Sequence, residues 1–286
     1  MQSLPSIDLH MHSTFSDGTD TPAQLLKAVK AAGLGCFALT DHDAIAGCVE
    51  LQGLLAPGDP QFIPGIEFSC KDELGKYHVL GYRYDPASLA ILDVLALGHR
   101  YRMKKLGLRL DYLRAEYGFV FPEEDLEALY AQPNPGKPHI ANLMVKHGYA
   151  KTKNQAFADY LNRLHAEDDY VRPEEAIRGI LGAGGVPVLA HPCYGDGDQI
   201  ILGDELEQRV VRLEAFGLQG LEGYYSGFSK PLRELVLSLA ERYGLYVTAG
   251  SDYHGTNKLV SLGDTGIKES AAPAEGILRF WEAVTT

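Results

Sequence analysis

Long hydrophobic runs are missing from this sequence of 286 residues: nowhere do about eighteen apolar residues follow one another. The amino terminus also lacks a basic region followed by an apolar stretch, which is the pattern of an export signal. The first absence excludes a transmembrane helix, and the second argues against export. We therefore expect a soluble, cytoplasmic protein that makes no contact with a membrane.

Cysteine is scarce, and none of the four cysteines stands in a close pair such as C-x-x-C. Three of them lie in or beside apolar or strand-like stretches, so we expect them to be reduced and mostly buried. The motif G-x-S-x-G is absent as well, and no cysteine has the basic neighbours that favour a thiolate. A serine or cysteine nucleophile is therefore not expected.

Positive charge is in short supply too, because 26 Lys and Arg face 38 Asp and Glu and the formal net charge is −12. Such a surface repels polyanions, so we do not expect the protein to bind duplex DNA. One stretch departs from this balance: residues 99–114 contain six Lys or Arg and one Asp. This run is either a solvated helix face or a surface that gathers an anionic substrate.

What the sequence does contain is an alternation of short apolar strands and helices. Thr21-Pro22 has the form of an N-cap followed by proline at the first helical position, and the helical periodicity lasts until Gly33. A short apolar strand over 36–40 follows, and strands and helices continue to alternate. The pattern favours an α/β barrel. In a parallel barrel, the carboxyl ends of all strands lie on one rim.

Between about residues 99 and 171 the pattern changes to helices without clear strands. We expect an inserted helical subdomain there, between two parts of the barrel domain, residues 1–98 and 172–286. A helix starting at Pro138 would offer free backbone N–H groups to a phosphate, although a plain helix-entry loop explains the sequence equally well. The insertion is expected to bind substrate through Arg102, Lys105, Asn134, Lys137 and His139.

Histidines and carboxylates recur at the predicted strand ends. His10 and His12 alternate at the end of the first strand, so both point to the same side of it. Imidazole and carboxylate ligands without thiolates suit zinc, manganese or iron. Nine such ligands are too many for one ion and suit two or three ions that share a carboxylate. The nine are His10, His12, Asp17, His42, Glu67, His78, His191, Asp252 and His254.

Six strings stand in a fixed order along the chain: D-L-H-M-H-S-T-F-S-D-G, T-D-H-D, G-I-E-F-S, H-V-L-G-Y, A-H-P and S-D-Y-H-G. Together they resemble the motifs of the PHP (polymerase and histidinol phosphatase) family, over roughly residues 5–98 and 173–260. The resemblance implies a distorted (β/α)7 TIM-like barrel with a trinuclear metal centre. It implies these ligand sets: His10, His12, Glu67 and Asp252 for one ion, Glu67, His78 and His191 for the second, and Asp17, His42 and His254 for the third.

The insertion, with its strings G-K-P-H-I-A and Y-V-R-P, is similar to that of bacterial nucleoside 3',5'-bisphosphate phosphatases that also trim short RNA. The resemblance implies a phosphomonoesterase in which a metal-activated water attacks phosphorus. We expect two to three divalent ions, manganese before zinc or iron, and a small phosphorylated substrate, either a nucleotide or a short oligoribonucleotide. The residues expected to take part in catalysis are Asp17, His42, Glu67 and His191.

Three other functions stay open. A histidinol phosphate phosphatase would share the family, but its small substrate does not explain a basic insertion. Metal-dependent amidohydrolases also open with H-x-H on a barrel strand, but T-D-H-D and S-D-Y-H do not fit their pattern. A metal-stabilised module that binds nucleic acid without chemistry is disfavoured by the net charge of −12. The sequence indicates no particular oligomeric state.

Overall fold

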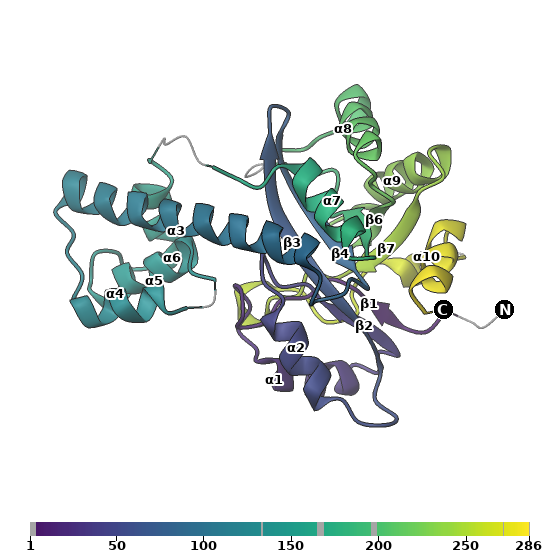
Figure 1. Cartoon of the computed structure of the whole chain (residues 1–286), viewed down its shortest axis with the longest axis horizontal. Helices are drawn as coiled ribbons and strands as arrows, with labels where there is room; N and C mark the ends of the chain where they lie inside the picture. The colour runs from purple at the N-terminus through teal and green to yellow at the C-terminus, as the bar shows by residue number, and fades with distance from the viewer. Residues whose placement is uncertain (1–3, 133, 165–168, 196–198, 271, 286) are drawn as a thin grey trace. The chain divides into compact units, whose positions relative to one another are not determined.

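The computed structural model describes residues 4–132, 134–164, 169–195, 199–270 and 272–285. The chain divides into two compact units, and Figure 1 labels most of their helices and strands. The barrel unit comprises Met1–Leu95 and Val171–Thr286, and the insertion unit comprises Ala96–Tyr170.

Seven strands form one sheet in the barrel unit, and strands adjacent in the chain are adjacent in the sheet. The first three strands are parallel to one another, and so are the last three, whereas β4 is antiparallel to both of its neighbours. The Leu9 N–H donates to the Ala249 carbonyl over 2.8 Å, which brings the two ends of the sheet together and nearly closes a barrel. The strands are β1 (Ile7–Asp8), β2 (Cys36–Leu39), β3 (Gln61–Asp72), β4 (Gly75–Tyr82), β5 (Val186–Leu189), β6 (Gly220–Tyr225) and β7 (Tyr246–Gly250).

The direction of β4 differs from that expected in a parallel barrel. β3 and β4 are joined by the turn at Glu73-Leu74, and Gly75 has φ +124°, a conformation that favours glycine. So short a turn joins only antiparallel strands, because a parallel connection needs about a dozen residues or more. His78 pairs with Ser69 across this hairpin. His78 lies in the first half of β4, and because β4 runs in the opposite direction, this half lies at the same end of the sheet as the other histidines.

The helices of the barrel unit follow local capping signals. The Thr21 hydroxyl accepts from the Gln24 N–H over 3.3 Å, and the Gln24 side chain accepts from the Thr21 N–H over 2.8 Å. Leu25 and Val29 of the helix that follows are fully buried in one cluster with Phe37 of β2. The helices are α1 (Pro22–Ala31), α2 (Ala46–Leu54), α7 (Pro173–Gly182), α8 (Gly203–Ala215), α9 (Lys230–Arg242) and α10 (Glu275–Thr285), with 3₁₀ turns at Gly255–Asn257 and Ile267–Glu269.

The insertion unit contains helices and, among its described residues, no strand. Leu106, Leu113 and Ile140 are fully buried in its core. α5 begins one residue earlier than predicted, at Lys137, so Pro138 takes the second helical position. The elements are α3 (Leu89–Tyr117), which begins in the barrel unit, α4 (Glu123–Tyr130), α5 (Lys137–Lys146), α6 (Lys153–Gln155) and a π-helical turn over Ala156–Leu161.

All four cysteines are buried and none forms a disulfide, which confirms the prediction made for them. Burial raises the pKa of the Cys193 thiol to about 12, so this residue near His191 stays protonated at neutral pH. Within the described ranges, no helix combines the length and the apolar character that crossing a bilayer requires.

Candidate metal centre

The two histidines after β1 are fully buried. They lie on an extended segment: the Asp252 N–H donates to the His10 carbonyl, and the His12 N–H donates to the Tyr253 carbonyl, each over 2.8 Å. Alternate residues of an extended segment point to the same side, so both imidazoles face the interior of the site. Their ring centroids lie 5.2 Å apart. The segment after β7 thus fixes the position of both rings.

Glu67 of β3 is surrounded by imidazoles from four other segments of the chain. Each of its two carboxylate oxygens faces more than one ring nitrogen. The Oε2 atom lies 3.2 Å from His10 Nε2, 3.2 Å from His12 Nε2 and 3.1 Å from His42 Nδ1, and the Oε1 atom lies 2.9 Å from His78 Nδ1 and 3.4 Å from His191 Nε2. This is the geometry expected of a carboxylate shared between cations.

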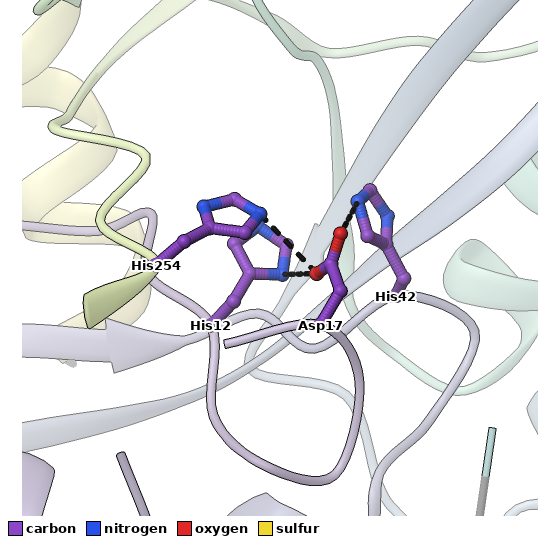
Figure 2. A group of neighbouring side chains, drawn as sticks. All are labelled: His12, Asp17, His42 and His254. Atoms are coloured by element: carbon purple, nitrogen blue, oxygen red, sulfur yellow. Dashed lines mark ion pairs between the residues drawn. The ribbon is translucent and has the colours of Figure 1, made fainter. Parts of the chain in front are cut away.

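A second carboxylate, that of Asp17, is surrounded by three imidazoles (Figure 2). Its Oδ1 atom lies 3.2 Å from His254 Nε2 and 3.8 Å from His12 Nδ1, and its Oδ2 atom lies 4.0 Å from His42 Nε2. His12 and His42 each present their other ring nitrogen to Glu67. These two histidines therefore link the surroundings of Glu67 to those of Asp17.

Two candidate ligands stand on strained backbone. His191, after β5, has φ +28°, and Asp252, after β7, has φ +59°, a region that side chains other than glycine rarely adopt. Hydrogen bonds hold both turns: the His191 N–H donates to Glu222 Oε2, and the Asp252 N–H donates to the His10 carbonyl, each over 2.8 Å. Asp252 Oδ1 then lies 3.6 Å from His10 Nε2 and 3.3 Å from His254 Nδ1.

The nine residues predicted as ligands, which include the four predicted for catalysis, thus lie in one connected cluster of the barrel unit. Within it, three groups bring their candidate ligand atoms within 4.8 Å of one another: His12, Asp17, His42 and His254; His10, His12 and Glu67; and His42, Glu67 and His78. The first group contains the whole of one ligand set implied by the resemblance, and the second contains three of the four residues of another. The assignment of each residue to an ion stays a prediction.

The cluster fits divalent cations. Buried atoms that face one another carry no hydrogen bond, among them His10 Nε2, His12 Nε2, Glu67 Oε1 and His78 Nδ1. A buried polar atom without a hydrogen bond lowers the free energy of unfolding by roughly 1–3 kcal/mol. A cation bound between such atoms would offset this loss. Imidazoles and carboxylates without a thiolate are ligands that manganese, iron and zinc accept.

The charge states of the cluster also favour cations. Burial would raise the pKa of Glu67, but the imidazoles around it, His10 first, hold that pKa well below its usual range. Burial opposes charge on His12, yet the carboxylates of Asp252 and Glu67 that face its ring raise its pKa to about 9. Burial prevails at His42 and lowers its pKa to about 3. Because ligands must be deprotonated, metal ions here compete with protons.

Glu222 of β6 is a functional residue that the sequence did not reveal. It is fully buried. Its Oε1 atom lies 2.8 Å from His10 Nδ1, and its Oε2 atom accepts from the His191 N–H. A proton on His10 Nδ1 leaves Nε2 as the lone-pair donor that faces Glu67. A carboxylate in this place is the usual partner of a metal-binding histidine. The only signal in the sequence was one charged residue inside a short strand.

Two buried aspartates hold the loops that carry the histidines. Asp41 accepts hydrogen bonds from the Ser13 N–H over 2.8 Å and from the Ser16 hydroxyl over 2.6 Å. Asp8 accepts from the N–H and the hydroxyl of Ser251 over 2.9 and 2.6 Å. These bonds tie the loops after β1, β2 and β7 to the barrel. The side chains of the cluster are therefore placed by the fold.

A pocket of about 360 Å³ opens onto the cluster, a volume within the range of small-molecule sites. Besides five of the candidate ligands, it is lined by Tyr194, Tyr225, Gly227 and Lys258. The Tyr225 hydroxyl and the Lys258 ammonium donate to Asp252 Oδ2 over 2.9 and 2.5 Å. Among the described lining residues, Lys258 alone is a lysine or arginine.

Three of the residues predicted to bind substrate meet at the start of α5 in the insertion unit. A Cβ on Gly136 would lie 3.3 Å from Arg102 Nη1, so the guanidinium borders this turn. Lys137 Nζ donates to the Asn162 side-chain carbonyl over 2.9 Å. The Gly136 N–H donates to His139 Nδ1 over 3.2 Å, so one of the backbone donors expected for a phosphate is engaged within the turn.

The other two predicted substrate-binding residues have different surroundings. Lys105 Nζ lies 3.3 Å from the centroid of the Tyr170 ring, a cation–π contact. Asn134 is buried. The substrate-binding role of all five residues stays a prediction.

Known proteins are similar to this chain over most of its length. The PHP domain model matches residues 8–210. The chain is 30% identical over 260 residues to 3',5'-nucleoside bisphosphate phosphatase of Chromobacterium violaceum, covering 88% of each chain. It is 29% identical over 283 residues to a 5'-3' exoribonuclease of Haemophilus influenzae, covering 96% of this chain and 97% of the relative. Identity to phosphoribosyl 1,2-cyclic phosphate 1,2-diphosphodiesterase of Eggerthella lenta is 32% over 255 residues, 87% of this chain and 94% of the relative.

Two solved structures share the fold over nearly the whole chain. One, described as a metal-dependent phosphoesterase from Bifidobacterium adolescentis, has a TM-score of 0.80 at 30% identity and covers 98% of this chain and 96% of its own. The other, described as an amidohydrolase from Chromobacterium violaceum with bound sulfate and no metal, has a TM-score of 0.81 at 29% identity and covers 97% and 96%. The chain belongs to the PHP domain family, as a metal-dependent phosphoesterase.

Proposed function

We propose that this phosphoesterase removes one phosphate from nucleoside 3',5'-bisphosphates and leaves a nucleoside monophosphate. The observation that carries the proposal is the position of Glu67, whose Oε2 atom faces His10 and His12 while its Oε1 atom faces His78 and His191. A carboxylate in this position suits a bridge between two ions, and paired divalent ions are a common device for phosphoester hydrolysis. The bisphosphate phosphatase of Chromobacterium violaceum supports the choice of substrate.

The residues of the chain fix where the reaction takes place. Divalent ions held by the cluster, for which we propose manganese before zinc or iron, would supply an activated water and would neutralise charge on the phosphoryl oxygens. Glu222 holds His10 by Nδ1, so that Nε2 points into the site. The side chains of Asp17 and His42 are 32% and 17% exposed, so this part of the cluster is accessible from outside the protein.

The second phosphate of a bisphosphate needs a cation outside the metal centre. α3 and the first turn of α5 carry Arg102, Lys105 and Lys137, and we assign the second phosphate to this part of the insertion unit. A short RNA with a 5' phosphate carries the same chemical groups in its terminal nucleotide. We therefore extend the proposal to such RNAs, and the exoribonuclease of Haemophilus influenzae supports this extension.

Other substrates have support of their own. The Eggerthella lenta relative is named for a cyclic phosphate, and one solved neighbour is described as an amidohydrolase. Histidinol phosphate is a further alternative, because the cluster would hydrolyse a small phosphomonoester equally well. The phosphoester alternatives lack either the nucleobase or the second phosphate, so one substrate panel separates them from a nucleoside bisphosphate. An amidohydrolase would leave the whole panel unhydrolysed.

Substrate hydrolysis by manganese-reconstituted protein tests the proposal, with inorganic phosphate measured for the phosphomonoesters and chromatography used to detect ring opening of the cyclic phosphate and mononucleotides released from the RNA. The panel contains adenosine 3',5'-bisphosphate, AMP, histidinol phosphate, ribose 1,2-cyclic phosphate and a 5'-phosphorylated trinucleotide. We expect the bisphosphate to have the highest kcat/KM. A preference for histidinol phosphate or for the cyclic phosphate would replace the proposed substrate while keeping the hydrolytic centre. Failure to hydrolyse any of the five substrates would contradict the proposed function.

A further inference from the structure

Three aromatic rings, those of Tyr194, Tyr225 and Phe228, form a group beside the metal centre that we name the aromatic wall. The centroid of Tyr225 lies 6.0 Å from that of Tyr194 and 5.2 Å from that of Phe228, and the Tyr194 and Phe228 centroids lie 5.6 Å apart. Phe228 is buried beneath the two tyrosines, both of which line the pocket. The aromatic wall adjoins the candidate ligands, because the Tyr225 ring lies 5.4 Å from that of His191.

Hydrogen bonds fix both tyrosines of the aromatic wall. The Tyr194 hydroxyl donates to the Gly227 carbonyl over 2.7 Å, and the Tyr225 hydroxyl donates to Asp252 Oδ2. Each ring is thus held at its polar end and packed against Phe228. A ring fixed in this way loses little conformational entropy when a ligand stacks on it.

Space beside these rings depends on Gly227. A Cβ on this residue would lie 2.7 Å from Tyr225 Cε1 and 3.6 Å from Tyr194 Cε2. Any other residue would therefore push against the Tyr225 ring and fill the part of the pocket next to it. The glycine leaves both rings accessible from the pocket that it lines with them.

The pocket therefore combines three surfaces of different chemistry. The histidine cluster suits the reacting phosphate, Lys258 is the cation among the lining residues, and the two tyrosines offer planar apolar faces. In a nucleotide, a single ribose separates the phosphate from the planar base. A base whose phosphate lies among the histidines would extend to the side chains that surround them.

We infer that the aromatic wall receives the base of the nucleotide, with Tyr194 as the stacking residue; this inference rests on the proposed function. Tyr225 is bordered by His191, Tyr194 and Phe228, and its hydroxyl holds a candidate ligand, so we assign it to support the stacking face. Stacking of one base on an aromatic side chain strengthens binding roughly ten- to hundredfold and tolerates different bases. The site thus selects nucleotides over other phosphoesters without selecting one base.

Two substrates that differ only in the base test this inference. They are adenosine 3',5'-bisphosphate and its abasic counterpart, 1-deoxyribose 3,5-bisphosphate. We expect wild-type protein to favour the base-bearing substrate by roughly tenfold or more in kcat/KM, mainly through KM. Tyr194→Leu should bring this ratio close to one. Tyr194→Phe, which keeps the ring and loses the hydroxyl, should retain this ratio. Tyr243→Leu is the matched control, because Tyr243 is the C-cap residue of α9 and is not among the residues that line the pocket.

A binding measurement accompanies the kinetics. Saturation-transfer difference NMR with AMP should show stronger saturation of the adenine protons than of the ribose protons on wild-type protein, and Tyr194→Leu should remove this difference. An unchanged substrate ratio in Tyr194→Leu, or equal losses on both substrates, would overturn the inference. If neither bisphosphate released phosphate, the proposed function would fail, and the NMR signal alone would decide whether the aromatic wall binds a base.

Discussion

At Asp252 the two carboxylate oxygens have separate tasks. Oδ2 accepts hydrogen bonds from Tyr225 and Lys258, while Oδ1 faces the imidazoles of His10 and His254. One oxygen thus orients the carboxylate, and the other is turned toward the centre of the site. Contacts of this kind place a ligand before an ion binds, so the ion does not have to order the side chain itself.

Glu222→Gln tests whether Glu222 positions the candidate ligand His10. The amide keeps the size of the side chain but replaces one accepting oxygen with an N–H₂ group, which would face either the His10 ring or the His191 N–H. We expect the affinity for manganese to fall about 10–100-fold, measured by calorimetric titration of metal-free protein. Glu234→Gln, on the exposed face of α9, is the control. A wild-type affinity in Glu222→Gln would show that Glu222 does not position His10.

At the scale of helices and strands, the elements beside the candidate metal ligands could be predicted, because capping residues and apolar runs are local sequence signals. Thr21 and Pro22 mark the start of α1 in the sequence, and the capping hydrogen bonds are present. The apolar run of β2 ends at Leu39, and His42 follows three residues later. Each of these signals depends on a few neighbouring residues. No knowledge of the rest of the chain was needed to read them.

Other features could not be predicted because they depend on contacts between distant residues. The reversal of β4 follows from the tight turn before Gly75, and the alternation of strands and helices in the sequence does not indicate this reversal. Glu222 has the sequence signal of any charged residue in a short strand. Only the packing of β6 against the segment of His10 shows that its carboxylate is fully buried and bonded to the ring.

Our prediction for the insertion unit concerns Lys137, in the first turn of α5. Lys137→Ala removes a positive charge and also the hydrogen bond to Asn162, whereas Asn162→Ala removes the same bond and keeps the charge. If the charge binds the second phosphate, Lys137→Ala should raise KM for adenosine 3',5'-bisphosphate roughly tenfold, the effect of losing one charged hydrogen bond. Steady-state kinetics on both variants measures this. Equal KM values for Lys137→Ala and Asn162→Ala would count against a phosphate contact.

Over the whole molecule, the barrel unit brings together candidate ligand residues from His10 to His254. Its sheet nearly closes through the hydrogen bonds between the segment after β1 and the end of β7. The same bonds position His10, His12 and Asp252. An unfolded chain would not hold these residues together, so ions that bind the folded cluster stabilise the fold as well.

The net charge of −12 affects which substrates the whole molecule can bind. An acidic molecule attracts cations and repels polyanions, so binding of an anionic substrate depends on local positive charge. In the pocket, that charge comes from Lys258 and from the ions that the histidine cluster is proposed to hold. Charge and site geometry thus both favour a small substrate over a long nucleic acid.

The most direct test of the proposed metal centre compares wild-type protein with Glu67→Ala. Metal content and phosphate release from adenosine 3',5'-bisphosphate are measured on the same manganese-reconstituted preparation, with circular dichroism to verify the fold. We expect two to three manganese ions per wild-type chain. Glu67→Ala should hold fewer ions and release no phosphate while its fold is retained. A folded Glu67→Ala protein with the full metal content and wild-type activity would contradict the role of Glu67 as the shared ligand of the catalytic ions.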